Sequence, residues 1–181
     1  MTGARDLEVV LRRASEFDFV IPEGDEDGNG HVSSRRYAEL HDQATDALFR
    51  RIGYPRADRL DGVFNIQSAT RHLGEVLVGH RVSGHVVLDD FDGRFFQVSG
   101  HIVNRTTGLV ATSFEALLGN VSLQSRRLQA APAEVVAQAE RERAAAAELG
   151  WAPLGLPPIR IRRAPDPAPP SGSSAPPPIS V

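Results

Sequence analysis

The fold of this chain is decided by a polar turn that leads directly into a long helix, Asp25-Glu26-Asp27-Gly28-Asn29-Gly30-His31-Val32-Ser33-Ser34-Arg35-Arg36-Tyr37. From Tyr37 to Ile52, apolar side chains recur every three or four residues, which is typical of one face of an amphipathic helix. Ser33 or Ser34 can cap its start, and Gly53 can end it. The sequence therefore predicts a helix with an acidic turn at its N-terminus.

This turn carries the residue types of an acyl-transfer site. Carboxylates such as that of Asp27 can attack a carbonyl carbon or deprotonate water. The first backbone N–H groups of a helix lack partners within the helix and lie at the positive end of its dipole. We therefore expect the helix start at Ser33, Ser34 and Arg35 to stabilise an oxyanion beside the carboxylate.

Strand patterns lie on both sides of the helix. Phe17, Phe19 and Ile21 alternate along the chain before the turn, which predicts a short strand. After Gly62 the apolar period changes to two and predicts strands over residues 63–73, 76–88, 95–103 and 109–118, with a hairpin turn at 89–93. We expect an α+β domain in which an antiparallel meander wraps around one long central helix.

The other segments flank a domain expected over residues 16–130. Residues 1–15 form an N-terminal extension, either a helical turn or a loose end. Residues 131–152 are rich in Ala, Glu and Arg and predict a C-terminal helix. Residues 153–181 contain 10 of the 13 prolines, so we expect a disordered tail.

Composition excludes several kinds of site and partner. The chain has no cysteine and no lysine, which excludes thiol nucleophiles, Schiff bases and Walker-type lysines. A net charge of −3 provides no basic surface for nucleic acid. No apolar run suits a signal peptide or a membrane helix, so a cytoplasmic location is the default. The histidines lack the spacing of metal ligands, and we expect neither a metal nor a cofactor.

Two motifs resemble a known family. The pattern D-x-x-G-x-V-x-x-x-x-Y places Asp27, Gly30, Val32 and Tyr37, and the ending R-x-G-x-P covers residues 51–55. Together they are similar to 4-hydroxybenzoyl-CoA thioesterase-type hotdog proteins over roughly residues 16–125. The resemblance implies a hotdog fold and hydrolysis of an acyl-CoA or acyl carrier protein thioester. It also implies a homodimer or homotetramer with active sites at the subunit interface.

The resemblance also implies roles for single residues. Asp27 would act as nucleophile or general base on the thioester carbonyl. The variant D-x-N-x-H-V is similar to plant acyl-ACP thioesterases and adds Asn29 and His31 to the site. Asp42 lies five residues after Tyr37, where bacterial relatives carry an acid; an exposed helix charge explains it equally well.

Three functions stay open at this point. A thioester hydrolase is the first. Ser33-Ser34 replace the paired asparagines of the plant pattern, which motivates a non-catalytic acyl-thioester-binding protein as the alternative. Asp27 and His31, four residues apart, also allow a hotdog hydratase or dehydratase. Because guanidinium groups bind phosphate well, Arg126 and Arg127 are candidate contacts for CoA or carrier-protein phosphate.

Overall fold

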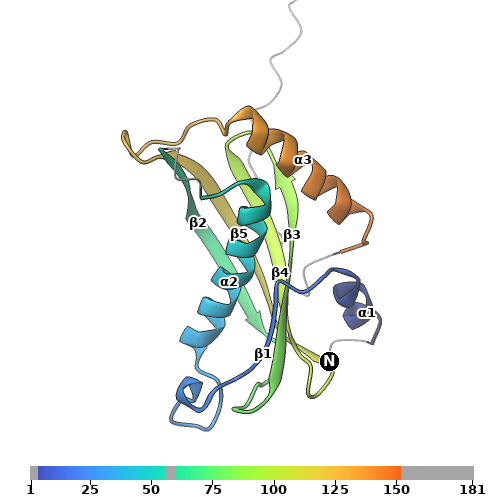
Figure 1. Ribbon diagram of the computed structural model, residues 1–181. Helices are drawn as coiled ribbons and strands as arrows, with labels where there is room; N and C mark the ends of the chain where they lie inside the picture. Colours follow the sequence, from blue (N-terminus) through green and yellow to red (C-terminus); the bar gives the residue numbers. More distant parts are fainter. Residues whose placement is uncertain (1–3, 56–59, 152–181) are drawn as a thin grey trace, which may run out of the picture.

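A computed structural model describes residues 4–55 and 60–151, which form one antiparallel sheet with a long helix across one face (Figure 1). None of the helices in these two ranges combines the length and apolarity that a bilayer crossing needs. The elements in chain order are α1 (Ala4–Arg12), β1 (Phe17–Val20), the 3₁₀ turn η1 (Glu23–Asp25), α2 (Ser34–Ile52), β2 (Asp61–His72), β3 (Arg81–Phe91), β4 (Phe95–Asn104), β5 (Leu109–Ser122) and α3 (Ala133–Ala147). The predicted α+β architecture is confirmed.

Helix α2 begins and ends at the predicted signals. The Ser33 hydroxyl accepts a hydrogen bond from the backbone N–H of Arg36 at 3.3 Å, so Ser33 is the N-cap. Gly53 has a φ of 113°, and its N–H donates to the Phe49 carbonyl at 2.9 Å. A side chain would be strained in that left-handed conformation, which is why glycine ends the helix well. The buried face of α2 consists of Tyr37, Leu40, His41, Ala44, Thr45, Leu48, Phe49 and Ile52.

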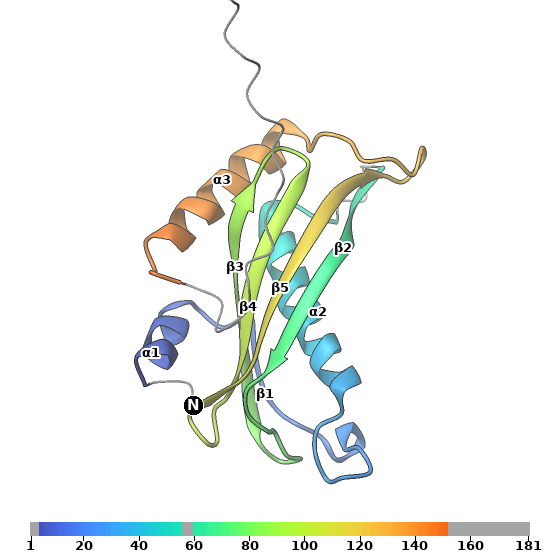
Figure 2. The ribbon, with the colours of Figure 1, turned by 180° about the vertical axis from the view of Figure 1, so that it is seen from behind.

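The sheet has the strand order β1-β3-β4-β5-β2, and all neighbouring strands are antiparallel. The expected meander is therefore wrong in one respect. Strands β3, β4 and β5 do follow one another, but β2 pairs with β5 at the far edge, because β1 pairs with the other side of β3. Helix α2 lies in front of the sheet in Figure 1 and behind it in Figure 2.

One predicted strand is displaced along the chain. Strand β3 begins at Arg81 rather than at residue 76. Val76 is fully buried, and its carbonyl accepts the N–H of Val32 at 3.0 Å. The segment before β3 thus supports the turn that leads into α2 instead of joining the sheet. Strand β3 also continues to Phe91, past the start of the expected hairpin turn, with a bulge after Leu88.

Helix α3 shares the hydrophobic core with α2. Val135 of α3 lies in one cluster with Leu48 of α2 and with side chains of β3, β4 and β5. Arg51 near the end of α2 forms an ion pair with Glu142 of α3 at 3.4 Å. The predicted C-terminal helix therefore packs against the domain. The predicted tail over residues 153–181 lies outside the described residues.

Strand β2 is an open edge of the sheet. Among the described strands, only β5 pairs with it. Its side chains are largely exposed, with Phe64 at 41% and Ile66 at 50% of their full accessibility. A long exposed edge presents unpaired N–H and C=O groups to another chain. The fold therefore leaves β2 as a long exposed edge.

Candidate active site

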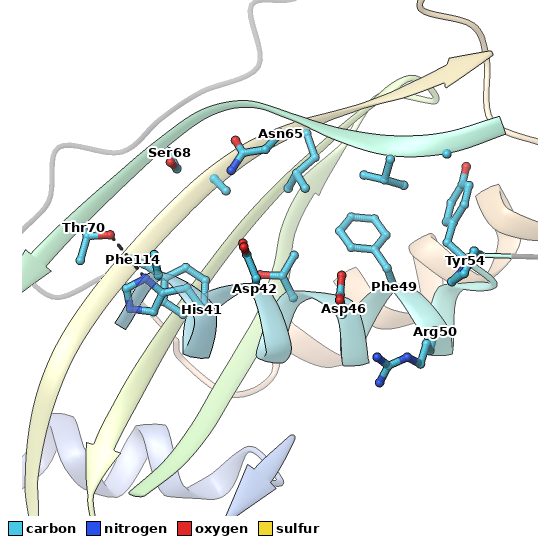
Figure 3. A pocket seen from close by; sticks show the side chains of 17 residues that line it. His41, Asp42, Asp46, Phe49, Arg50, Tyr54, Asn65, Ser68, Thr70 and Phe114 are labelled. Atoms are coloured by element: carbon cyan, nitrogen blue, oxygen red, sulfur yellow. Dashed lines mark hydrogen bonds between the residues drawn. The ribbon is translucent and has the colours of Figure 1, made fainter. Parts of the chain in front are cut away.

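A cavity of about 570 Å³ lies between α2 and β2, next to the open edge (Figure 3). This volume is within the range of small-molecule sites. Strand β5 forms the floor between the helix and β2. The cavity is lined by acidic, polar and aromatic side chains, which include the carboxylates of Asp42 and Asp46, the polar groups of Asn65 and Ser68, and the rings of Phe49, Tyr54 and Phe114.

Asp42 points from α2 into this cavity, toward Asn65 and Ser68 of β2 (Figure 3). Partial burial raises the pKa of Asp42 above its ordinary value, and the negative charge of Asp46 adds to the effect. No described residue forms an ion pair with either carboxylate. A carboxyl group with a raised pKa in a cavity is suited to proton transfer. Asp42 is thus an exposed helix residue that lines the cavity, and its role in the site stays a prediction.

His41 is a cavity residue that sequence reasoning assigned only to the apolar stripe of the helix. It is 7% exposed, its Nε2 lies 2.9 Å from the Thr112 hydroxyl, and its ring stacks on Phe114 at 4.3 Å. Burial lowers the pKa of His41 from 6.5 to about 4, so the ring is neutral at neutral pH. A histidine inside an apolar stripe and next to a carboxylate was the signal that could have identified it.

Two groups with opposite pKa shifts give opposing contributions to stability in acid. Because the pKa of His41 is lowered on folding, the unfolded chain binds that proton more tightly, and stability is lost as the pH falls from about 6.5 toward 4. Burial raises the pKa of Asp89 from 3.8 to about 7, and nearby carboxylates add to the effect. The folded chain binds the Asp89 proton more tightly, so this group adds stability as the pH falls from about 7 toward 3.8.

Single variants are expected to separate these two contributions. Asp89→Asn removes the acid-side gain, so the free energy of unfolding should fall between about pH 7 and pH 5 by about 2 kcal/mol relative to the wild type. His41→Gln removes the loss of stability in acid. Its free energy of unfolding should therefore rise between about pH 7 and pH 5 by about 2 kcal/mol relative to the wild type. Urea unfolding at the two pH values measures both differences. Parallel pH profiles for the wild type and both variants would contradict the two assignments.

Asp27 lies in the turn before α2 and is not part of the cavity lining. Its carboxylate accepts the backbone N–H groups of Asn29 at 2.8 Å and His31 at 3.3 Å. These hydrogen bonds hold the pKa of Asp27 below its ordinary value, because they stabilise the charged form. Gly30, with a φ of 81°, allows the tight turn that aims both N–H groups at the carboxylate. The turn thus presents an ionised carboxylate, as a nucleophile or base requires.

The side chains of Asn29 and His31 differ in their main contacts, because the Asn29 side chain also helps to lower the pKa of Asp27 by hydrogen bonding. The His31 ring nitrogen Nε2 lies 3.0 Å from a Glu75 carboxylate oxygen, and the ring is about half exposed. Asn29 is exposed. Both residues also donate a backbone N–H to the Asp27 carboxylate. The main side-chain contact of His31 is therefore with Glu75.

The three backbone N–H groups expected to stabilise an oxyanion at the start of α2 differ in whether they already have an acceptor. The Ser33 N–H donates to the Asp25 carbonyl at 3.1 Å, so it is occupied, and Ser33 acts through its hydroxyl as the helix cap. Within the described part of the chain, the N–H groups of Ser34 and Arg35 have no acceptor. A helix start with free N–H groups attracts a developing negative charge. Stabilisation of an oxyanion therefore stays a prediction for the N–H groups of Ser34 and Arg35 and is dropped for that of Ser33.

Arg126 and Arg127 lie on the turn after β5, and both are exposed. The guanidinium of Arg126 lies over the Phe64 ring, 6.0 Å from its centroid. This turn and the turn before α2 are at opposite ends of the molecule in both views (Figures 1 and 2). Within one subunit, the predicted phosphate contacts are therefore far from Asp27.

Comparison with known proteins identifies the type of domain. A family model for the thioesterase-like superfamily matches residues 21–139. The chain is 32% identical over 108 residues to L-carnitine dehydrogenase/betainyl-CoA thioesterase of Agrobacterium fabrum, which covers 59% of this chain and 22% of that protein. The protein of the same name from Rhizobium meliloti is 27% identical over 114 residues, which covers 62% of this chain and 23% of the relative. The chain thus matches less than a quarter of the length of either relative.

Solved structures share the fold at low sequence identity. A putative thioesterase from Pseudomonas putida has a TM-score of 0.71 and 23% identity, covering 84% of this chain and 98% of that one. A Staphylococcus aureus protein in complex with CoA has a TM-score of 0.66 and 15% identity, covering 73% and 85%. A 4-hydroxybenzoyl-CoA thioesterase variant, complexed with 4-hydroxybenzoyl-CoA, has a TM-score of 0.60 and 16% identity, covering 68% and 96%. At these identities the likeness concerns the fold, and the predicted hotdog fold is confirmed.

Proposed function

Because the chain belongs to the thioesterase-like superfamily, we propose that it hydrolyses acyl-CoA thioesters. The oxygen of a water molecule becomes bonded to the carbonyl carbon, the C–S bond breaks, and the departing sulfur takes up a proton. The products are a carboxylic acid and free CoA. The observation that carries this proposal is an ionised Asp27 next to a helix start with free N–H groups. An acyl carrier protein presents the same thioester and is the second donor to test.

In this proposal the turn before α2 supplies the chemistry. Asp27 either attacks the carbonyl carbon directly or takes a proton from the attacking water. The N–H groups of Ser34 and Arg35 stabilise the oxyanion that forms on the carbonyl oxygen. Asn29 and His31 hold the Asp27 carboxylate in place. Asp42, in the cavity, is a second carboxylate for proton transfer.

In this proposal a second subunit completes each site. Pairing of β2 with the β2 of a second copy, about a two-fold axis through the sheet, makes one continuous antiparallel sheet. Both α2 helices then lie on the same face and run in opposite directions. The turn before α2 in one subunit then lies at the same end of the dimer as the C-terminal end of the partner's α2. Asp27 therefore approaches the partner's cavity and the partner's Arg126 and Arg127, which can bind the phosphates of CoA.

The first expected result is a homodimer in solution. Light scattering after size-exclusion chromatography should give the mass of two chains at micromolar concentration, because the exposed β2 edge pairs with itself. A tetramer would be a further association of two such dimers. A monomer at micromolar concentration would contradict the composite site.

Thiol release tests the proposed reaction directly. The purified protein is incubated with a panel of CoA esters that includes betainyl-CoA, 4-hydroxybenzoyl-CoA and fatty acyl-CoA, and with acyl carrier protein esters. Because the chain contains no cysteine, a thiol reagent reports only the released thiol. Turnover of at least one CoA ester above the buffer rate is expected. No release from any ester would contradict hydrolysis.

Two alternative functions give different outcomes in the same panel. An acyl-thioester-binding protein would bind an ester in calorimetry without releasing thiol. A hydratase or dehydratase would change the absorbance of an enoyl-CoA while the thioester stays intact. The contact of the His31 ring with Glu75 disfavours an Asp27–His31 catalytic pair. A cytoplasmic location stays a prediction.

A further inference from the structure

We propose that residues 152–163 of this chain dock on the outer face of the sheet, which is the face turned away from α2, and that arginines of this segment bind the acidic side chains there. The inference goes beyond the proposed function, because it concerns neither the catalytic turn nor the cavity. Three observations carry it: the charge of the outer face, the place of the last described residue, and the composition of the segment.

The outer face is polar where β4 and β5 meet. Side chains alternate along a strand, so Val98 of β4 packs in the core with α2 while its neighbour Ser99 points to the outer face. Glu115 of β5 lies opposite Ser99 and is 1% exposed. Figure 2 looks onto this face, and no described helix crosses the middle of β4 and β5 there. The described helices therefore do not explain why Glu115 is buried.

Three acids lie close together on the outer face. Asp89 lies in the bulge of β3, and Asp90 follows it opposite Gln97 of β4. The charges of Glu115 and Asp90 both add to the raised pKa of Asp89, because nearby negative charges disfavour its ionisation. Arg71 is on the same face, but at the exposed edge strand β2, with β4 and β5 between it and β3. A segment that covers the centre of this face therefore needs positive charge.

The last described residue, Trp151, lies on this face. Its indole N–H donates to the Ser99 hydroxyl at 2.9 Å, and its ring centroid lies 4.6 Å from that of His101. The ring also packs with the small apolar cluster formed by α1, β4 and β5. Because Ser99 is the neighbour of Glu115 across the strands, residue 152 starts beside the acids of the outer face.

The segment after Trp151 has the composition that this face needs. Residues 152–163 contain three arginines and no acid, and their large apolar residues can pack on the sheet: Leu154, Leu156, Ile159 and Ile161. Nine extended residues reach about 30 Å, whereas neighbouring strands lie about 5 Å apart, so Arg160 can reach the acids of β3 and β5. Seven of the ten prolines after residue 152 lie beyond residue 164. The expectation of disorder therefore applies to residues 164–181.

Trypsin tests whether the segment is docked. The chain has no lysine, so trypsin cleaves only after arginine, and Arg160 and Arg162 lie inside the segment. In the folded full-length protein, cleavage after these two residues should be at least about tenfold slower than in a synthetic peptide of residues 152–169, because a docked segment is cut only when it opens. Arg127, on the exposed turn after β5, is the internal control for protease activity. Mass spectrometry follows each cleavage.

Variants of the full-length protein locate the charges that hold the segment. Glu115→Gln and Asp90→Asn each keep the size of a side chain and remove one negative charge from the outer face. Each should speed cleavage after Arg160 and Arg162 by about five- to tenfold, because a charged hydrogen bond is lost. The matched control is Glu140→Gln, which removes one negative charge from the exposed surface of α3 and should leave the rate unchanged. Thermal melting of each variant verifies that the fold is intact.

The outcomes decide what covers the outer face. Slow cleavage that becomes faster in Glu115→Gln or Asp90→Asn, but not in Glu140→Gln, would support the docked segment. Cleavage at the rate of the free peptide would overturn the inference. If that rate came with a mass above two chains in light scattering, the cover would be the outer face of a second copy. Slow cleavage that neither acid variant changes would overturn the pairing of arginines with acids.

Discussion

Asp27→Asn is expected to lower kcat/KM for thioester hydrolysis by about 10²–10⁴, the usual cost of losing a general base. The substitution keeps the size of the side chain and an oxygen that accepts the N–H groups of Asn29 and His31. It removes the negative charge and the basicity. The turn should therefore keep its shape while the chemistry is lost. Steady-state assays of thiol release measure the change.

Stability and neighbouring variants serve as controls for this result. The melting temperature of Asp27→Asn should stay close to that of the wild type, because the turn is at the surface. Asn29→Ala and His31→Ala should cost less activity, since alanine keeps the backbone N–H groups that both residues donate to Asp27. If Asp27→Asn keeps its activity and Asp42→Asn abolishes it, the catalytic carboxylate is the one on the helix. That outcome would refute the assignment of the turn.

Two inactive variants are expected to restore activity when their subunits are mixed. Asp27→Asn lacks the carboxylate, and Ser68→Trp fills the cavity from β2. If each site combines Asp27 of one subunit with the cavity of the other, a mixed dimer has one intact site and one site with both defects. Random reassortment should then recover about a quarter of the wild-type turnover, because half of the dimers are mixed.

The experiment unfolds the two variants together in urea, refolds them, and compares thiol release with that of each variant refolded alone. Light scattering verifies that Ser68→Trp still forms dimers. If the Asp27 carboxylate and the cavity of one subunit served the same site, no combination would contain an intact site. Absence of recovery from a mixture that contains dimers of both variants would therefore rule out the shared site.

The beginning and end of α2 were predicted closely because their signals are local. The Ser33 cap and the Gly53 termination depend on contacts three or four residues along the chain. The Asp27 turn is local in the same sense, since its hydrogen bonds reach only as far as His31. Short-range spacing in the sequence therefore contains the information for this part of the candidate site.

The cavity depends on pairings that the sequence pattern does not encode. An apolar period of two predicts strands but does not give their order, so the pairing of β2 with β5 was missed. That pairing places Asn65 and Ser68 opposite Asp42. In the sequence, His41 looks like an ordinary core residue of the helix. Its contacts with Thr112 and Phe114 of β5 exist only in the folded sheet.

The long helix, the acidic turn before it and the resemblance to a thioesterase-type domain could all be predicted from the order of the amino acids alone. The open edge strand, the carboxylates that line the cavity and the buried groups with shifted pKa values become visible only in the folded chain. The physical reason is the range of the contacts. Caps and turns are stabilised by atoms a few residues apart, whereas burial and strand order depend on segments that meet only when the whole sheet has formed.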